Sequence, residues 1–149
     1  MGSFGGSFTE EIDAPPERCF ALASDMGGIS AWQDPTEATA VLERHPDGRA
    51  ALVEMRIDAQ VSKVTVVMRF GYDEPAGLHW TRERGDLKRV DGSWRFEPIG
   101  AGRTRATYTL DIDPGRMLSM LAKGSVVDRL TRHLGEQPPR GLKRVAEGP

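Results

Sequence analysis

The sequence predicts an α+β fold in which an antiparallel sheet of about seven strands is covered by one long C-terminal helix. Hydrophobic residues recur at every second position between about Thr36 and Asp113, which is typical of strands with one buried face. From Ser125 to Glu147 they recur every three to four positions, as in an amphipathic helix. A sheet that is apolar on one side requires a covering layer, and this helix is the only expected element large enough.

The composition fits one domain without a strong electrostatic character. The chain has 149 residues, a net charge of −2 and a pI near 5.9, so nothing indicates nucleic-acid binding. We expect residues 1–6, which are rich in Gly and Ser, to be flexible and residues 7–149 to form the domain. Cys19 is the single cysteine, the N-terminus does not resemble a signal peptide and no run is long enough to span a bilayer, which favours a cytoplasmic protein.

The first expected elements are a strand, a helix and a short helical turn. Alternation indicates a strand over 8–13. The two prolines that open the next segment favour a helix that starts there and ends at Gly27 and Gly28. One more turn of helix is expected from Ile29 to Trp32, before the turn signal Asp34-Pro35.

Six strands are then expected, and the short turns between them make neighbouring strands antiparallel. Their predicted bounds are about 37–45, 49–59, 61–73, 77–85, 87–97 and 103–112. The Asp91-Gly92 pair is compatible either with a turn or with a bulge inside one long strand. The inward face is expected to carry Ala51, Val53, Met55, Ile57, Val64, Val66, Met68, Phe70, Tyr72, Leu78, Trp80, Arg82, Trp94, Phe96, Thr104, Ala106, Tyr108, Leu110 and Ile112.

The C-terminal helix is expected to run from an N-cap at Ser125 to Glu147. Its apolar stripe keeps its phase across Pro138 and Pro139, so these prolines indicate a kink or local break within one element. The stripe consists of Val127, Leu130, Leu134, Leu142 and Val145. A separate short apolar segment precedes the helix and contains Met117, Leu118, Met120 and Leu121.

Several short motifs resemble one known family. They are Ile12-Asp-Ala-Pro-Pro-Glu17, Asp91-Gly-Ser-Trp94, Gly102-Arg-Thr104, Asp113-Pro-Gly115 and Gly141-Leu-Lys143. In this order and spacing they resemble the polyketide cyclase/dehydrase and lipid-transport superfamily, which includes START-like, SRPBCC and birch-pollen-allergen-like proteins. The resemblance implies a helix-grip fold, in which a curved sheet wraps around the long helix and leaves a hydrophobic cavity between them.

Three polar residues on the inward face are candidate catalytic groups, although the resemblance supplies no catalytic motif. Arg82 could bind a ligand carboxylate or enolate, or it could reach the rim of the sheet and pair at the surface. Tyr108 could act as an acid or anchor a ligand by a hydrogen bond, or it could be a satisfied core hydroxyl. Glu10 could be a general base inside the cavity, or it could be exposed.

The expected ligand-binding residues share the inward face or the start of the helix, and each could equally be ordinary core. Near the Met-rich segment, Val127 and Leu130 are expected ligand contacts, whereas Leu142 and Val145 are expected anchors. The full set is Met55, Met68, Phe70, Trp80, Arg82, Trp94, Phe96, Tyr108, Met117, Met120, Val127 and Leu130. The three histidines lack the spacing of a metal site, and we expect no cofactor.

Two functions of different classes remain open. Cavity walls are abundant and reactive groups are sparse, which favours binding of a hydrophobic small molecule, polyketide, isoprenoid or lipid-like, by a carrier or sensor. The alternative is a polyketide aromatase/cyclase that folds its substrate in the same cavity. We expect a monomer or a homodimer in either case.

Overall fold

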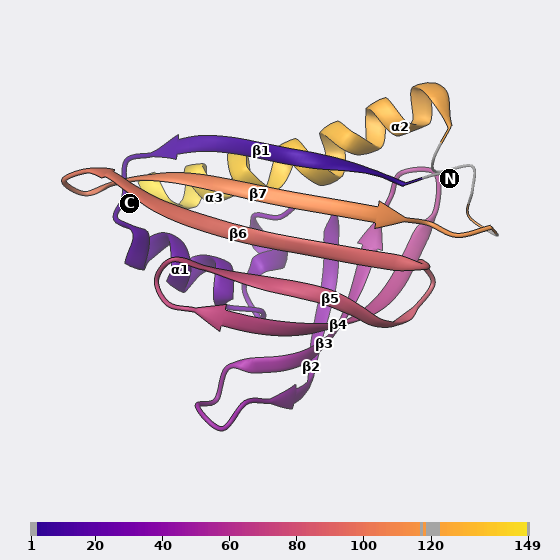
Figure 1. The fold of residues 1–149 in the computed structure, drawn as a ribbon, viewed down its shortest axis with the longest axis horizontal. Coiled ribbons are helices and arrows are strands. Elements are labelled where there is room, and N and C mark those ends of the chain that lie inside the picture. Colours follow the sequence, from indigo (N-terminus) through magenta and orange to yellow (C-terminus); the bar gives the residue numbers. More distant parts are fainter. Residues whose placement is uncertain (1–2, 117, 119–122, 149) are drawn as a thin grey trace.

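The computed structural model describes residues 3–116, 118 and 123–148 and contains the predicted antiparallel sheet. Seven strands lie in the order β1-β7-β6-β5-β4-β3-β2, so the first strand in the sequence pairs with the last (Figure 1). This confirms the predicted α+β class and the antiparallel meander. The strands are β1 (Phe4–Ile12), β2 (Thr36–Arg44), β3 (Ala50–Asp58), β4 (Lys63–Asp73), β5 (Gly77–Gly85), β6 (Arg89–Gly100) and β7 (Arg103–Asp113).

Helices occupy the two predicted places, after β1 and at the C-terminus. The first group is α1 (Pro16–Ser24) with the short 3-10 helix η1 (Ile29–Ala31). The second is a continuous helical path of α2 (Gly124–Leu130), the π-helical turn η3 (Thr131–Glu136) and α3 (Gln137–Glu147), which we call the C-terminal helix. It runs along β1 and β7 in Figure 1 and also contacts α1. No helix in the described ranges is long and apolar enough to cross a bilayer.

Strand β1 begins at Phe4, inside the stretch that the composition predicts to be flexible. Phe4 pairs with Ile112 and is buried, so residues 4–6 belong to the sheet. A Cβ on Gly5 would overlap the backbone of Leu110, and Gly5 has a φ of +147°, a conformation that favours glycine. The glycines that suggest flexibility are therefore required here by close strand packing.

Strand β6 passes through the Asp91-Gly92 pair without a turn or a bulge. Gly92 pairs with Trp80 of β5, and Asp91 pairs with Thr81 with no shift of register between them. A Cβ on Gly92 would overlap the indole ring of Trp80. The pair does lie inside one long strand, as one of the two predictions had it, but the predicted turn and bulge are both wrong: Gly92 leaves room for a neighbouring aromatic ring.

The C-terminal helix begins one residue before the predicted N-cap. Gly124 is its first residue, with a φ of +45°, and Lys123 occupies the N-cap position without a side-chain hydrogen bond. Because Gly124 already makes the turn into the helix, Ser125 lies within the first turn and does not cap it.

The local break expected at the two prolines is a π-helical turn. Pro138 and Pro139 lack the N–H groups that an α-helix would donate to the carbonyls of Leu134 and Gly135. In η3 the backbone N–H of Gln137 donates instead to the carbonyl of Arg132, five residues earlier. The wider π turn accommodates the proline rings, so the helix continues through them.

Two glycines bring the C-terminal helix unusually close to its neighbours. A Cβ on Gly135 would overlap the ring of Phe8 on β1, and one on Gly141 would overlap the carbonyl oxygen of Trp32 after η1. The helix is therefore seated between β1 on one side and the η1 segment on the other. Between these contacts, Leu142 is fully buried in the core.

We expect Leu142→Ala to lower the free energy of unfolding by about 2–5 kcal/mol, because it removes a fully buried side chain from the helix–sheet interface. Chemical denaturation followed by circular dichroism measures this change. The matched control is Leu42→Ala, since Leu42 is 45% exposed on β2 and should change stability by less than about 0.5 kcal/mol. Equal effects of the two substitutions would contradict the placement of Leu142.

Gly135→Ala should destabilise the protein by about 1–3 kcal/mol through overlap with Phe8, despite the better helix propensity of alanine. If the overlap is the cause, the double variant with Phe8→Ala should lose less stability than the sum of the two single variants. A double-mutant cycle in denaturation experiments measures this coupling. Additive losses would show that the glycine is not needed for this contact.

Candidate functional site

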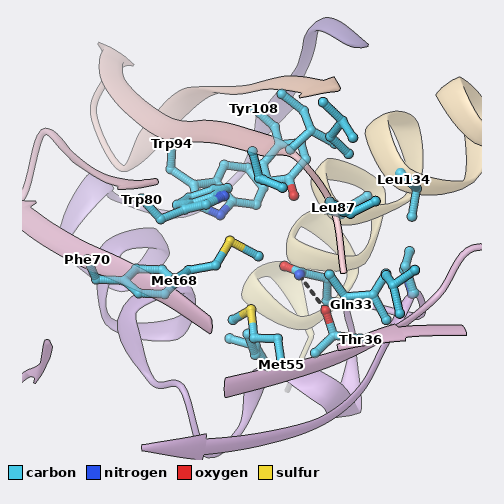
Figure 2. Close-up of a pocket in the computed structure, with 18 of the residues that line it drawn as sticks. Gln33, Thr36, Met55, Met68, Phe70, Trp80, Leu87, Trp94, Tyr108 and Leu134 are labelled. Atoms are coloured by element: carbon cyan, nitrogen blue, oxygen red, sulfur yellow. Dashed lines mark hydrogen bonds between the residues drawn. The ribbon is translucent and has the colours of Figure 1, made fainter. Parts of the chain in front are cut away.

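A cavity lies between the inward face of the sheet and the C-terminal helix (Figure 2). Its empty space is about 810 Å³, including the part open to solvent. Every strand contributes at least one lining residue, and the helix contributes Leu134 and Pro138. The cavity therefore occupies the place between sheet and helix that the sequence predicts.

Aromatic rings form one wall of the cavity. Phe70 pairs with Trp80 across β4 and β5, with ring centroids 5.6 Å apart, and Trp94 pairs with Tyr108 across β6 and β7, at 4.7 Å. Trp80 and Tyr108 join the two pairs, with centroids 5.7 Å apart. The pairs lie in one row because residues opposite each other on antiparallel strands point to the same face. The row offers ring faces and edges to a flat or unsaturated ligand.

Methionine and aliphatic side chains form the rest of the apolar lining. Met55 and Met68 come from β3 and β4, and in Figure 2 Met68 lies beside Phe70 and Met55 below Met68. Leu87 precedes β6, and it faces Leu134 of the helix in the same view. Methionine side chains can adjust their shape to an irregular ligand because they are unbranched and have three rotatable bonds.

The Tyr108 hydroxyl points into the cavity without a partner. The side chain is only 5% exposed, and its hydroxyl makes no hydrogen bond with any residue that the structure describes. Burial raises the pKa of Tyr108 above its usual value because the tyrosinate anion would be poorly solvated there. The group therefore remains a neutral hydroxyl that can donate a hydrogen bond across the physiological pH range.

A second polar position is formed by Gln33 and Thr36, just before and at the start of β2. Nε2 of Gln33 donates to Oγ1 of Thr36 over 2.7 Å, and both residues line the cavity (Figure 2). Gln137 of the C-terminal helix holds this segment in place. Its Nε2 donates to the carbonyl of Trp32, and its Oε1 accepts from the N–H of Asp34, each over 2.9 Å.

No charged side chain lines the cavity in the part of the chain that the structure describes. Tyr108 is the only side chain there that could release a proton near or above neutral pH. The described residues also contain no group of three or more His, Cys, Asp or Glu side chains arranged to hold a metal ion. The site is thus suited chemically to enclosing an uncharged molecule and to hydrogen bonding at a few points.

Six of the residues proposed from the sequence do line the cavity, and they are Met55, Met68, Phe70, Trp80, Trp94 and Tyr108. Phe96 does not line it. It is buried behind Trp94, with ring centroids 5.6 Å apart, and belongs to the packed core. Alternation assigns a residue to a face of the sheet, but it does not say where along the strand the cavity ends.

Arg82 shares the inward side of β5 but does not line the cavity. It pairs with Met68 next to a bulge in β4–β5, and its Nη2 donates to the carbonyl of Gly85 over 3.1 Å. Its Nε is shielded from solvent and has no partner among the described residues. The guanidinium therefore turns towards Gly85 at the end of β5. This resembles the predicted alternative in which Arg82 reaches the rim of the sheet.

Glu10 lies on the edge strand β1 and is half-buried outside the cavity. It borders a shallow groove between β1 and the C-terminal helix, where Glu136 and Arg140 are neighbours. Strand β1 packs along the C-terminal helix, and of its residues only Phe4 lines the cavity.

The first turns of the C-terminal helix, where ligand contacts were expected, do not line the cavity. Leu130 is fully buried and Val127 is half-buried against the core, but neither lines the cavity. Leu134, one turn further on, does line it and lies in the π-helical turn η3. Met117 and Met120 lie outside the described residues.

Sequence reasoning missed the Gln33–Thr36 position and the contribution of Phe4. The stretch around Asp34-Pro35 gives only a turn signal, and the alternating pattern starts at Thr36. Nothing in the sequence of a polar pair next to a turn indicates that it lines a cavity, because this depends on how distant parts of the chain pack around it. Phe4 was not predicted to line the cavity because Gly5 and Gly6, which follow it, indicate a flexible segment.

Comparisons with known proteins agree with this architecture. The model of the family described as polyketide cyclase/dehydrase and lipid transport matches residues 6–147. A search of curated proteins found no significant match. Similar solved structures include the protein TTHA0849 from Thermus thermophilus, which is 25% identical over 93% of this chain and 94% of that chain, with a TM-score of 0.79.

Two further structures share the fold at lower identity. A START superfamily protein from Mycobacterium smegmatis is 23% identical over 87% of this chain and 93% of that chain, with a TM-score of 0.69. The aromatase/cyclase Zhui from Streptomyces sp. R1128 is 19% identical over 97% of this chain and 94% of that chain, with a TM-score of 0.78.

The two tyrosines of the chain should titrate well above pH 10 in the folded protein. Burial raises the pKa of Tyr72 to about 12 and also raises that of Tyr108, whereas an unfolded chain releases these protons near pH ~10. The folded state then holds protons that the unfolded state has lost, so stability should fall as the pH rises from about 10 towards 12. Tyrosinate absorbance against pH measures the titration, with Tyr108→Phe to isolate Tyr72. Ionisation of both groups near pH ~10 in folded protein would contradict this burial.

Proposed function

Because the chain belongs to the polyketide cyclase/dehydrase and lipid-transport family, we propose that it binds a hydrophobic small molecule between the sheet and the C-terminal helix, as a carrier or sensor. The observation that carries this proposal is the cavity itself, which has an almost wholly apolar lining and an opening to solvent. A protein core without a ligand-binding role is normally packed without such a space.

The lining supports a ligand with a flat or unsaturated skeleton, such as a polyketide, an isoprenoid or a related lipid. The aromatic row of Phe70, Trp80, Tyr108 and Trp94 offers stacking surfaces, and Met55 and Met68 add an adaptable lining next to it. Burial of apolar ligand surface would provide most of the affinity, at roughly 25 cal/mol for each Å² removed from water.

The alternative function, a polyketide aromatase/cyclase, is supported by the family description and by the likeness in fold to Zhui. Cyclisation requires protons to be removed and returned at the substrate, which is the work of general acids and bases. Among the described lining residues only Tyr108 could take part, and its raised pKa makes its anion a minor species. This chemistry favours binding over catalysis.

The proposal extends to the cellular setting and the oligomeric state. The single cysteine, Cys19, is buried and free, which fits a reducing compartment such as the cytoplasm. The cavity is formed within one chain, so a monomer could bind the ligand as well as a homodimer could.

Ligand binding can be tested with the neutral dye N-phenyl-1-naphthylamine, which becomes fluorescent in apolar surroundings. We expect binding to the wild-type protein and a loss of at least about tenfold in Met55→Trp, because the larger ring fills the cavity next to Met68. Leu42→Trp, on the exposed part of β2, should bind the dye normally. Circular dichroism would establish that both variants are folded.

Native mass spectrometry of the purified wild-type protein provides a separate test, because it detects a small molecule retained during purification. Absence of dye binding to the wild-type protein, or equal binding by folded Met55→Trp, would contradict binding in this cavity.

A further inference from the structure

The polar groups of the cavity have unused hydrogen-bonding capacity, and this capacity points to the class of ligand. Most buried polar groups in proteins have a hydrogen-bond partner. Tyr108 as a whole is only 5% exposed, and its hydroxyl, which a water-sized molecule can still reach, has no hydrogen-bond partner among the described residues. A hydroxyl at the surface of an apolar cavity can therefore take its hydrogen-bond partner from a bound ligand.

The Gln33–Thr36 pair is in a similar position on another wall of the cavity. The single bond from Nε2 of Gln33 to Oγ1 of Thr36 leaves the second amide hydrogen and Oε1 of Gln33 without a partner among the described residues. The Thr36 hydroxyl accepts in this bond and donates to no other described residue, so its hydrogen is also available to a ligand. This position can therefore both donate to a ligand oxygen and accept from a ligand hydroxyl.

The C-terminal helix determines where Gln33 lies. The side-chain amide of Gln137 binds the backbone on both sides of Gln33, at the carbonyl of Trp32 and the N–H of Asp34. Gly141, one turn further along α3, lets the helix approach the Trp32 carbonyl closely. Gln137 is thus a positioning residue, which holds Gln33 at the cavity without lining it.

Charge excludes one whole class of ligands. A carboxylate or ammonium group moved from water into this cavity would meet no opposite charge among the described lining residues. Such a group loses its hydration and gains nothing comparable in return, so its binding is strongly disfavoured. Hydroxyl and carbonyl oxygens lose much less, and Tyr108 and Gln33 can pair with them.

We propose that the cavity selects uncharged ligands that carry hydroxyl or carbonyl oxygens, and that Tyr108 and Gln33 recognise these oxygens, with Gln137 holding Gln33 in position. This inference rests on the proposed function, because it names the ligand class of the same cavity. Figure 2 shows the Tyr108 hydroxyl and the Gln33 amide reaching into the cavity from different walls.

The experiment uses three probes with the same two-ring skeleton: naphthalene, 2,6-dihydroxynaphthalene and 2-naphthoate. Their dissociation constants are measured by NMR titration of the full chain at neutral pH. The quantity of interest is the selectivity, defined as the dissociation constant of naphthalene divided by that of the diol. We expect 2-naphthoate to bind at least about tenfold more weakly than the diol, because its charge is not compensated.

Single substitutions then show which residues produce this selectivity for the diol over naphthalene. Tyr108→Phe and Gln33→Met should each lower it about threefold to tenfold, as expected for one hydrogen bond, and should leave naphthalene binding nearly unchanged. Gln137→Met should lower the selectivity in the same direction. The matched control is Tyr72→Phe, which removes a hydroxyl that donates to the carbonyl of Ala50 outside the cavity and should leave the selectivity unchanged.

The outcomes separate this inference from the function on which it rests. If neither N-phenyl-1-naphthylamine nor any naphthalene probe binds, the proposed binding function fails and the inference fails with it. If naphthalene binds but the selectivity is the same in wild type, Tyr108→Phe and Gln33→Met, the function stands and the recognition by these residues is wrong. Equal binding of 2-naphthoate and the diol would overturn the exclusion of charged ligands. An unchanged selectivity in Gln137→Met alone would remove only the positioning role.

Discussion

The close seating of the C-terminal helix is the contact on which the rest of this structure depends. Gly135 lies against Phe8 of β1, and Gly141 lies against the Trp32 carbonyl, so the helix is held on both sides where a side chain would not fit. This seating places Leu134 and Pro138 over the cavity and brings Gln137 to the backbone around Gln33. The π turn of η3 is part of the same arrangement, because it lets the helix continue through two prolines without leaving its place.

The distribution of charge follows from the same architecture. Arginine and carboxylate side chains pair on the outer face of the sheet, as Arg69 does with Glu83 and Arg89 does with Asp111. These pairs are solvent-exposed, so each contributes little to stability. Among the described residues, no charged side chain lines the cavity on the other side of the sheet. The helix then closes over a cavity whose described polar groups are neutral and few.

The cavity combines two demands that usually conflict. Packing requires the inward side chains to fill space, whereas binding requires a space to remain. Here the aromatic row from Phe70 to Tyr108 is packed ring against ring along the sheet, so the wall is rigid without help from a ligand. Gly92 makes this possible by leaving room for the indole of Trp80. The space then lies between this wall and the helix, where Leu134 and the methionines are the adaptable surfaces.

The sequence by itself determined the strands, the amphipathic C-terminal helix and the face to which Met55, Met68, Phe70, Trp80, Trp94 and Tyr108 belong, because these depend on local periodicity. Only the tertiary structure decided which inward residues meet the cavity. Phe96 and Leu130 fit the pattern as well as Trp94 and Leu134 do and are equally buried, yet they do not line the cavity. Gln33 and Thr36 are functional candidates for the same reason: Gln137, more than 100 residues later in the chain, binds the backbone on both sides of Gln33, beside the cavity.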